Sequence, residues 1–370
     1  MIFKRKNADK NDLKADIEKL LRKRMRKGDK AVNAYLLVHS EPLDIHVNIA
    51  AGKTGDEPVN PNRPNYMASV GKLFTSTLVS TLYEEGELSF EDRISEYLDD
   101  DILDGLHVYK GHDYTNEIRI KNLLNHTSGL PDAFWHLLEE LLANPELDLS
   151  PRKAIEWGKE NRKPHFPPGK KFYYTDTNYY LLGFIVEEIT GMPFHEVLKE
   201  RIFEPLNMKH SYMLHSSEPI EDPGLPIADF YHEGERMSDL KVFQDSEGYA
   251  GIDYAGGGVV APMEDLLKFM KALVNYEIIE KETLETMMED KARFGLGIDY
   301  GYGIWMLKKI PLLMPEKFES WGVVGATGAF MFYHPKTDSY LIGNFNDTYF
   351  ERKGVRFMIK VIKKLINFSS

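Results

Sequence analysis

The spacing of apolar and polar positions predicts a helix followed by a β-hairpin in the first part of the chain. Five apolar residues recur at helical spacing within residues 12–30, which predicts an amphipathic helix: Leu13, Ile17, Leu20, Leu21 and Met25. Two short apolar segments follow at 33–40 and 44–52, and the Glu41-Pro42 break separates them. This pattern is typical of a hairpin, because turn residues connect two short strand-like runs.

The middle of the chain reads as mostly helical. A helix is expected at 71–85, where Gly86 ends it, and helix-period apolar residues with Pro and Gly breaks fill 118–209. Residues 218–248 are rich in proline and charge and are expected to form a loop. Helices return at 262–275 and 281–290.

The last hundred residues change to strand-like patterns. Period-two or continuous β-branched runs occur at 301–307 (GYGIWML) and 321–325 (WGVVG), and two further runs, GAFMFYHP and SYLIGNFN, flank a turn at 335–338. A closing helix is expected at 350–368.

Strands at both ends and helices between them indicate an α+β fold with one antiparallel sheet built from both termini and flanked by helices. We expect residues 1–370 to form a single domain, in which 1–115 and 250–370 make the α/β part and 116–249 make an inserted, mainly helical part. The cleft between the two parts is then the expected ligand site.

Composition excludes several classes of protein. The formal net charge of −12 argues against nucleic-acid binding, since phosphate backbones select basic surfaces. The chain has no cysteine, so disulfides, thiolate catalysis and cysteine-bound metals are absent. The histidines are scattered and no His-Glu-x-x-His motif occurs, so neither a metal nor an organic cofactor is implied. A small-molecule substrate is the expected partner, and the oligomeric state cannot be read from the sequence.

The N-terminal stretch MIFKRKNADKNDLKADIEKL has no apolar run long enough for a signal peptide or a membrane span, so a cytoplasmic location is expected. The helix at 12–30 is basic as well as amphipathic, and such helices can lie on a membrane. We favour the simpler interpretation, in which its leucine stripe packs on the domain.

Ser69 and Lys72 are the strongest candidates for chemistry. Three residues apart at the start of a helix, they lie on one face about one turn from each other. The lysine can then reach the serine hydroxyl, and the helix N-terminus favours developing negative charge. The alternative interpretation of an isolated Ser-x-x-Lys is an N-cap serine with a solvated lysine. No G-x-S-x-G elbow surrounds Ser69, so the α/β-hydrolase arrangement is excluded.

Longer stretches around this pair carry a family resemblance. NYMASVGKLFTSTLVSTLYEEGELSFEDRISEYL resembles the nucleophile helix of class C β-lactamases and related esterases, and IRIKNLLNHTSGLPD resembles the next segment of that family. PGKKFYYTDTNYYLLG is similar to the family's PGxxFxYSNxxYxLLG. This match implies that Tyr174 is the catalytic tyrosine and that Asp176 replaces the usual asparagine; Tyr173 is the neighbouring candidate. His126, in the HTSGL turn, is expected to be structural.

The family's third element is Lys-Thr-Gly or His-x-Gly on an inner strand. The sequence Lys53-Thr54-Gly55 matches this element literally, but it precedes the nucleophile and so is not the counterpart of the family's third element. It is not a phosphate loop either, because such a loop would need glycine at position 47, which is valine. GVVGATGAF (322–330) fits instead and puts Val323 where lysine or histidine is expected. GIDYAGGGVVAPMEDLLKFM and YGYGIW add two further matches, so the resemblance covers about residues 33–346.

The chain is therefore identified as a member of the class C β-lactamase and penicillin-binding-protein-like serine hydrolases, which include carboxylesterases and D-amino-acid peptidases. The resemblance implies a β-lactamase/DD-peptidase-like fold and acyl transfer through an ester on Ser69. It also implies an oxyanion site made by the backbone N–H groups of Ser69 and Ala326, with Gly325 and Val323 on the same strand beside the substrate.

Two departures from the family pattern change the expected chemistry. A carboxylate at Asp176, lying against Lys72, would raise the pKa of the lysine by roughly 1–3 units for a close pair and keep it protonated. Tyr174, as a phenolate, would then be the principal base. Val323 removes a cation that grips substrate carboxylates, a hydrogen bond worth about 1.5–3 kcal/mol. Arg293 or Lys308 could substitute for it.

These departures favour a carboxylesterase-like hydrolase of esters or related acyl substrates. Two alternatives stay open: a β-lactamase or D-amino-acid peptidase or amidase, and a member without turnover that binds a peptide or partner.

Overall fold

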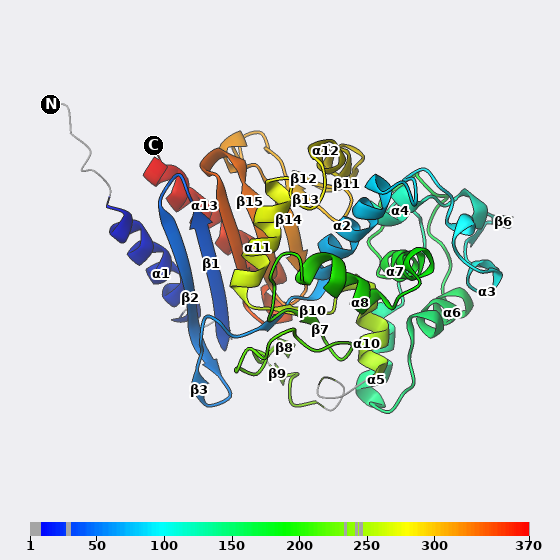
Figure 1. Ribbon diagram of the computed structural model, residues 1–370, viewed down its shortest axis with the longest axis horizontal. Helices are drawn as coiled ribbons and strands as arrows, with labels where there is room; N and C mark the ends of the chain where they lie inside the picture. The colour runs from blue at the N-terminus through cyan, green and yellow to red at the C-terminus, as the bar shows by residue number, and fades with distance from the viewer. Residues whose placement is uncertain (1–8, 27–30, 233–234, 241–242, 244–246, 370) are drawn as a thin grey trace.

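The computed structural model describes residues 9–26, 31–232, 235–240, 243 and 247–369 (Figure 1). Within these residues the main sheet has nine strands in the order β11-β12-β13-β14-β15-β16-β1-β2-β3, with antiparallel pairing along the sheet. The strands are β1 (Asn33–Ser40), β2 (Ile45–Thr54), β3 (Glu57–Pro58), β11 (Ala292–Gly295), β12 (Ile298–Tyr300), β13 (Trp305–Leu307), β14 (Ser320–Gly325), β15 (Ala329–His334) and β16 (Ser339–Asn344).

The two ends of the chain meet in the middle of this sheet. β1 pairs with β16 in a register that places Tyr35 opposite Asn344 and Leu37 opposite Ile342. The expectation of one α+β sheet assembled from both termini is therefore confirmed. The β1–β2 and β15–β16 hairpins lie where the turn residues at 41–44 and 335–338 predicted them.

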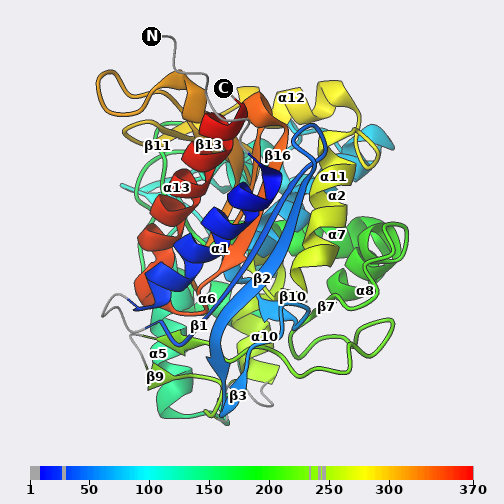
Figure 2. The ribbon, with the colours of Figure 1, turned by 90° about the vertical axis from the view of Figure 1, so that its left-hand side faces the viewer.

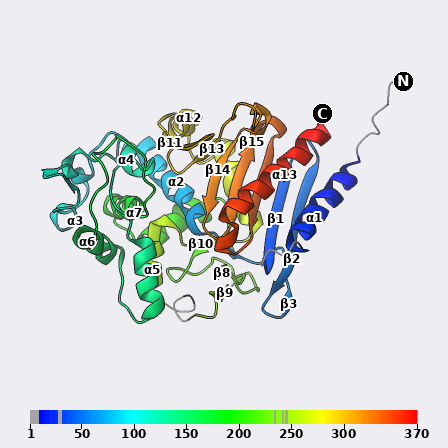
Figure 3. The same ribbon diagram turned by 180° about the vertical axis from the view of Figure 1, so that it is seen from behind.

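Helices cover both faces of the sheet. α1 (Lys10–Arg26) and α13 (Glu351–Ser369) lie side by side on one face, as Figures 2 and 3 show, and α2 (Gly71–Glu84) and α11 (Met263–Val274) lie on the other. The leucine stripe of α1 is buried in the core that α1 and α13 share with the sheet: Leu13, Ile17 and Leu21 are at most 5% exposed. This is the packed arrangement that the sequence favoured. Across the described residues, no helix combines the length and apolar character needed to span a membrane.

The part of the chain that follows α2 and precedes α11 in the sequence is mainly helical, and most of it lies beside the sheet (Figure 1). Its longer helices are α5 (Phe134–Ala143), α6 (Pro151–Asn161) and α7 (Thr177–Thr190), and its shorter ones are α3 (Asp100–Leu103), α4 (Ile120–Leu124), α8 (Phe194–Leu198) and α10 (Glu247–Asp253). α12 (Lys281–Glu289) precedes the return of the chain to the sheet. Short strand pairs occur as well: β5 (Val108–Tyr109) with β6 (His112–Asp113), and β8 (Tyr231–His232) with β9 (Glu235–Arg236).

Two expectations need correction. The strand expected at 301–307 begins only at Trp305, because Gly303 has a φ of +70° and bends the chain before β13. The loop expected at 218–248 contains the β8–β9 hairpin and the start of α10. The paired segments are only two residues long each, and the charged composition of this region gave no strand pattern for them.

Candidate active site

Ser69 lies at the junction between the two parts of the chain. It belongs to a short 3-10 turn (Ala68–Val70) that leads directly into α2. The turn is anchored behind Ser69, because the Met67 N–H donates to the Val259 carbonyl at 2.9 Å, next to the pairing of β4 (Asn65–Tyr66) with β10 (Val259–Ala261). Ala68 has a φ of +48°, a left-handed conformation that costs energy for a residue with a Cβ. Ser69 is half-buried and lines a cavity.

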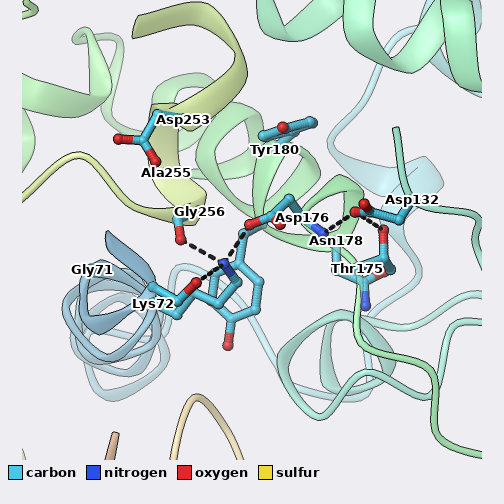
Figure 4. A network of polar contacts seen from close by, with 12 residues as sticks. Gly71, Lys72, Asp132, Thr175, Asp176, Asn178, Tyr180, Asp253, Ala255 and Gly256 are labelled. Carbon is cyan, nitrogen blue, oxygen red and sulfur yellow. Dashed lines mark hydrogen bonds and ion pairs between the residues drawn. The ribbon is translucent and has the colours of Figure 1, made fainter. Parts of the chain in front are cut away.

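The Lys72 side chain is fully buried in the first turn of α2, three residues after Ser69. Its Nζ lies 3.4 Å from Ser69 Oγ and donates to the Gly256 carbonyl at 2.5 Å. It also forms an ion pair with Asp176 at the start of α7 (Figure 4). The Ser-x-x-Lys spacing therefore places both side chains together, and α7 brings the carboxylate that the sequence alignment put beside them.

Lys72 is an ammonium in this site. Burial lowers its pKa, but the negative charge of Asp176 and the hydrogen bond that Lys72 donates to it raise the pKa by more, so the net shift is above the ordinary lysine value. This direction agrees with the effect expected of the asparagine-to-aspartate departure.

Tyr174 lies two residues before Asp176 and beside Lys72. Lys72 Nζ is 5.1 Å from the centre of the Tyr174 ring, and the tyrosine hydroxyl interacts with Ser69 and Lys72. Burial raises the Tyr174 pKa, and this effect outweighs the lowering by Lys72. The phenolate form expected from the sequence is therefore disfavoured, and Tyr174 is a phenol in this site.

The structure separates Tyr174 from its neighbour. Tyr173 also lines the cavity, but its ring stacks on His165 with centres 3.8 Å apart. Of the two tyrosines, it is Tyr174 whose side chain meets the Ser69–Lys72 pair.

His126 supports the tyrosine loop from beneath. Its ring lies 4.3 Å from that of Tyr174, and its Nδ1 accepts from the Asn178 amide at 3.0 Å and from the Thr175 N–H at 3.4 Å. Burial and the charge of Lys72 hold the pKa of His126 well below its usual value. A neutral, packed histidine of this kind fits the structural role expected from the sequence.

Asp132 is a member of this network that sequence reasoning did not single out. Its carboxylate accepts from the Asp176 N–H at 2.8 Å and from the Thr175 hydroxyl at 3.2 Å, and Figure 4 shows it on the far side of that loop from Lys72. Burial and the charge of Asp176 raise its pKa to about 6. Asp132 is the last residue of the HTSGLPD stretch, so this motif contained a signal for it, but the sequence pattern indicated a role only for His126 in that stretch.

The end of β14 forms the opposite wall. Gly325 packs so closely on the Met67 carbonyl that any side chain there would overlap it, and this contact brings Gly325 and Ala326 to the Ser69 turn. Both residues line the cavity, as expected of an oxyanion site on this strand.

The Val323 prediction requires a correction. Adjacent strand residues point to opposite faces of a sheet. Val323 is 1% exposed and packs in the core between the sheet and α2, and it does not line the cavity, whereas Val324 does. Arg293 and Lys308, proposed as substitute cations, are also not among the lining residues.

The cavity has a volume of about 700 Å³, large enough for a drug-sized molecule. Its walls come from the Ser69 turn, α5, the Tyr174 loop, the β8 region, α10 and β14. Among the described residues, no three His, Cys, Asp or Glu side chains are grouped so as to hold a metal ion.

Asp253, at the end of α10, is a second buried carboxyl group on the cavity wall. It is 6% exposed and accepts from the Tyr66 hydroxyl at 3.0 Å. Burial raises its pKa to about 7, and the charge of Asp176 acts in the same direction.

These raised pKa values predict a pH dependence of stability. Between the ordinary aspartate pKa of 3.8 and about 7, the folded chain binds more protons at Asp253 than the unfolded chain does. The free energy of unfolding is therefore expected to fall as the pH rises through this window. Urea unfolding at pH 5 and pH 8 measures the change, and Asp253→Asn should make it smaller. An equal change in both proteins would contradict the assignment.

Comparison with known proteins agrees with this geometry. The model of the beta-lactamase family matches residues 19–359. Penicillin-binding protein 4* of Bacillus subtilis (strain 168) is 27% identical over 315 residues, which are 82% of this chain and 65% of that protein. A putative D-alanyl-D-alanine carboxypeptidase of Escherichia coli (strain K12) is 27% identical over 62% of this chain and 57% of its own length. The chain thus spans less than two thirds of the length of these curated relatives.

Solved structures share the fold. D-amino acid amidase from Ochrobactrum anthropi SV3 superposes with a TM-score of 0.78 and 21% identity over 97% of this chain and all of that one. EstCE1, a hydrolase with promiscuous acyltransferase activity, superposes with a TM-score of 0.77 and 18% identity over 96% of this chain and 99% of that one. The chain belongs to the beta-lactamase family, with the α+β fold of penicillin-binding proteins.

Proposed function

We propose that the protein hydrolyses carboxylic esters or related acyl substrates through a covalent acyl-Ser69 intermediate. The observation that supports this most directly is the 3.4 Å approach of Lys72 Nζ to Ser69 Oγ, in a cavity that also holds Tyr174. A nucleophile, a buried ammonium and a phenol converge there.

In the proposed acylation step, Ser69 Oγ attacks the carbonyl carbon and its proton passes to the Tyr174 hydroxyl oxygen. Tyr174 in turn gives its own proton to the leaving-group oxygen, so the phenol is regenerated and no net charge is left on it. The Lys72 ammonium stabilises the negative charge that develops between these oxygens. The N–H groups of Ser69 and Ala326 hold the carbonyl oxygen. Water repeats the sequence in reverse to release the acid.

The substrate preference follows from what β14 presents to the cavity. The strand presents Val324, Gly325 and Ala326 to the cavity, and Arg293 and Lys308 lie outside the lining, so this wall offers no cation for a substrate carboxylate. Esters and neutral amides suit it better than penicillins or D-alanyl-D-alanine termini do.

The competing activity is that of an amidase or peptidase for D-amino acids. It is favoured by the names of several relatives and structural neighbours, which include a putative D-alanyl-D-alanine carboxypeptidase and a D-amino acid amidase. A member that binds without turnover is the third candidate, and the Asp176 and Val323 departures from the family pattern motivate it.

Side-by-side assays separate these activities. We expect turnover of short-chain p-nitrophenyl esters to exceed that of a chromogenic cephalosporin and of D-phenylalanine amide, and we expect a fluorophosphonate probe to label the wild type but not Ser69→Ala. Faster hydrolysis of the cephalosporin or the amide would overturn the ester assignment. Equal labelling of Ser69→Ala, or no labelling at all, would overturn acylation of Ser69.

A further inference from the structure

The charged side chains that line the catalytic cavity are all of one sign. Five acidic residues line it: Asp132, Glu139, Asp176, Asp253 and Glu351. The described residues that line it include no lysine or arginine. The Lys72 ammonium lies beneath the cavity wall and is already paired with Asp176. Other things being equal, such a cavity repels anions and attracts cations.

Asp253 is connected through Tyr66 to a group of four aromatic rings that contact one another. Its carboxylate accepts from Tyr66, whose hydroxyl lies 2.7 Å from that of Tyr249. The rings of Tyr66 and Phe230 have centres 5.4 Å apart, those of Phe230 and Phe243 4.9 Å, and those of Phe243 and Tyr249 4.5 Å. All four rings line the cavity. We call these five residues the Asp253 subsite.

Within the subsite, the direct partners of the Asp253 carboxylate are neutral. They are the Tyr66 hydroxyl and the backbone N–H of Gly258. Because no cation lies directly beside it, the Asp253 carboxyl group lacks a counter-charge, and a bound ammonium group would supply one and favour its ionised form. Aromatic faces attract cations through their ring electrons, and cages of such rings bind quaternary ammonium groups. The carboxylate and the rings therefore favour the same kind of ligand.

A second, independent feature of the cavity also indicates a polar substrate. Thr327 follows Ala326 on the oxyanion side and is 3% exposed. Its hydroxyl oxygen has no hydrogen-bond partner among the described residues. A buried hydroxyl without a partner costs free energy, so it is a group left for the substrate to satisfy.

We propose that the Asp253 subsite binds an ammonium group carried by the substrate, so that the enzyme selects cationic acyl compounds over neutral ones of the same shape. This inference rests on the proposed function, because it assigns the substrate class of the same Ser69 cavity. The ammonium group can lie on the acyl side or on the alcohol side of the ester.

Isosteric substrate pairs test the proposal. Each pair has one ester ending in a trimethylammonium group and one ending in a tert-butyl group; the first pair carries the group on the acyl chain, and the second on the alcohol. The ratio of kcat/KM for the cationic ester to that for the neutral ester is measured. In at least one pair, the wild type should favour the cation, and Asp253→Asn should lower the ratio about ten- to a hundredfold. No preference in either pair, or a ratio that Asp253→Asn leaves unchanged, would overturn the proposal.

Asp265→Asn is the matched control. Asp265 is also a buried carboxylate, at 1% exposure, but it lies at the start of α11, where it accepts from the His210 N–H and the Ser211 hydroxyl, and it does not line the cavity. The Asp265→Asn variant makes the same change in net charge as Asp253→Asn, and it should leave the ratio of the two kcat/KM values as in the wild type. Should Asp253→Asn not fold, Phe230→Leu removes one ring, keeps the carboxylate, and should lower the ratio in the same direction.

A binding measurement separates failure of the subsite from failure of the proposed function. Calorimetric titration of Ser69→Ala with butyltrimethylammonium should give a Kd that rises at least about tenfold when Asp253→Asn is added. If no ester is hydrolysed and no probe labels Ser69, the proposed function fails, while this titration still decides the subsite. An unchanged Kd would count against the subsite even in an active hydrolase.

Discussion

Replacing Lys72 with methionine is expected to destabilise the protein by about 3–5 kcal/mol and to reduce ester turnover by about 10²–10⁴-fold. The side chain is fully buried, and its ammonium pairs with Asp176 and donates to the Gly256 carbonyl. Methionine keeps the length and apolar stem, but it leaves a buried carboxylate and a carbonyl oxygen without their donor. Urea unfolding gives the stability change, and kcat with a p-nitrophenyl ester gives the activity change.

The double variant Lys72→Met/Asp176→Asn shows how the two losses arise. Removing the unpaired charge should restore much of the stability lost in Lys72→Met, because the remaining amide is neutral. It should not restore turnover, since no ammonium then lies beside Ser69. A double variant as unstable as the single one would mean that packing, and not the buried charge, dominates the effect.

The sequence was sufficient for the parts of the site that depend on local spacing. Ser69 and Lys72 needed only one helical turn to meet, and the register of the YYTDTNYYLLG stretch placed Tyr174 and Asp176 at the start of α7. The strand patterns and turn residues of the termini predicted the β1–β2 and β15–β16 hairpins for the same reason, since alternation and turns are local signals.

Other features depended on tertiary approach and had no local signal. The acceptor for Lys72 at Gly256 is a backbone carbonyl, which no side-chain pattern reveals. Val323 was placed correctly on the strand, but strand alternation turns it into the core, so it does not line the cavity. Asp253 is far from Ser69 in sequence and reaches the cavity only because α10 packs against it.

The residue types alone likewise could not show how burial and charge balance in setting the pKa of Tyr174. Lys72 does lower the Tyr174 pKa, as expected, but burial raises it by more. The outcome depends on how much protein surrounds the ring, and the fold sets that quantity. This is why the phenolate predicted from the sequence gives way to a phenol that accepts one proton and gives up another.

Tyr174→Phe is expected to reduce kcat for ester hydrolysis by about 10²–10⁴-fold with little loss of stability. The phenylalanine ring keeps the contacts with His126 and Tyr300, so the loop should hold its position. What is lost is the hydroxyl through which the proton of Ser69 reaches the leaving group. Asp176→Asn should cost far less, because the amide oxygen can still accept from Lys72 and the proton relay is intact.

Tyr173→Phe is the matched control for this prediction, since it removes a hydroxyl from the adjacent residue, whose ring stacks on His165. Its effect on kcat should be far smaller than that of Tyr174→Phe. Leaving-group dependence adds a readout that a structural role would not affect. In Tyr174→Phe, esters of alkyl alcohols should lose more activity than p-nitrophenyl esters, whose leaving group needs no proton. Near-wild-type turnover of both ester types in Tyr174→Phe would remove the tyrosine from the proton path and leave Lys72 as the group that must serve Ser69.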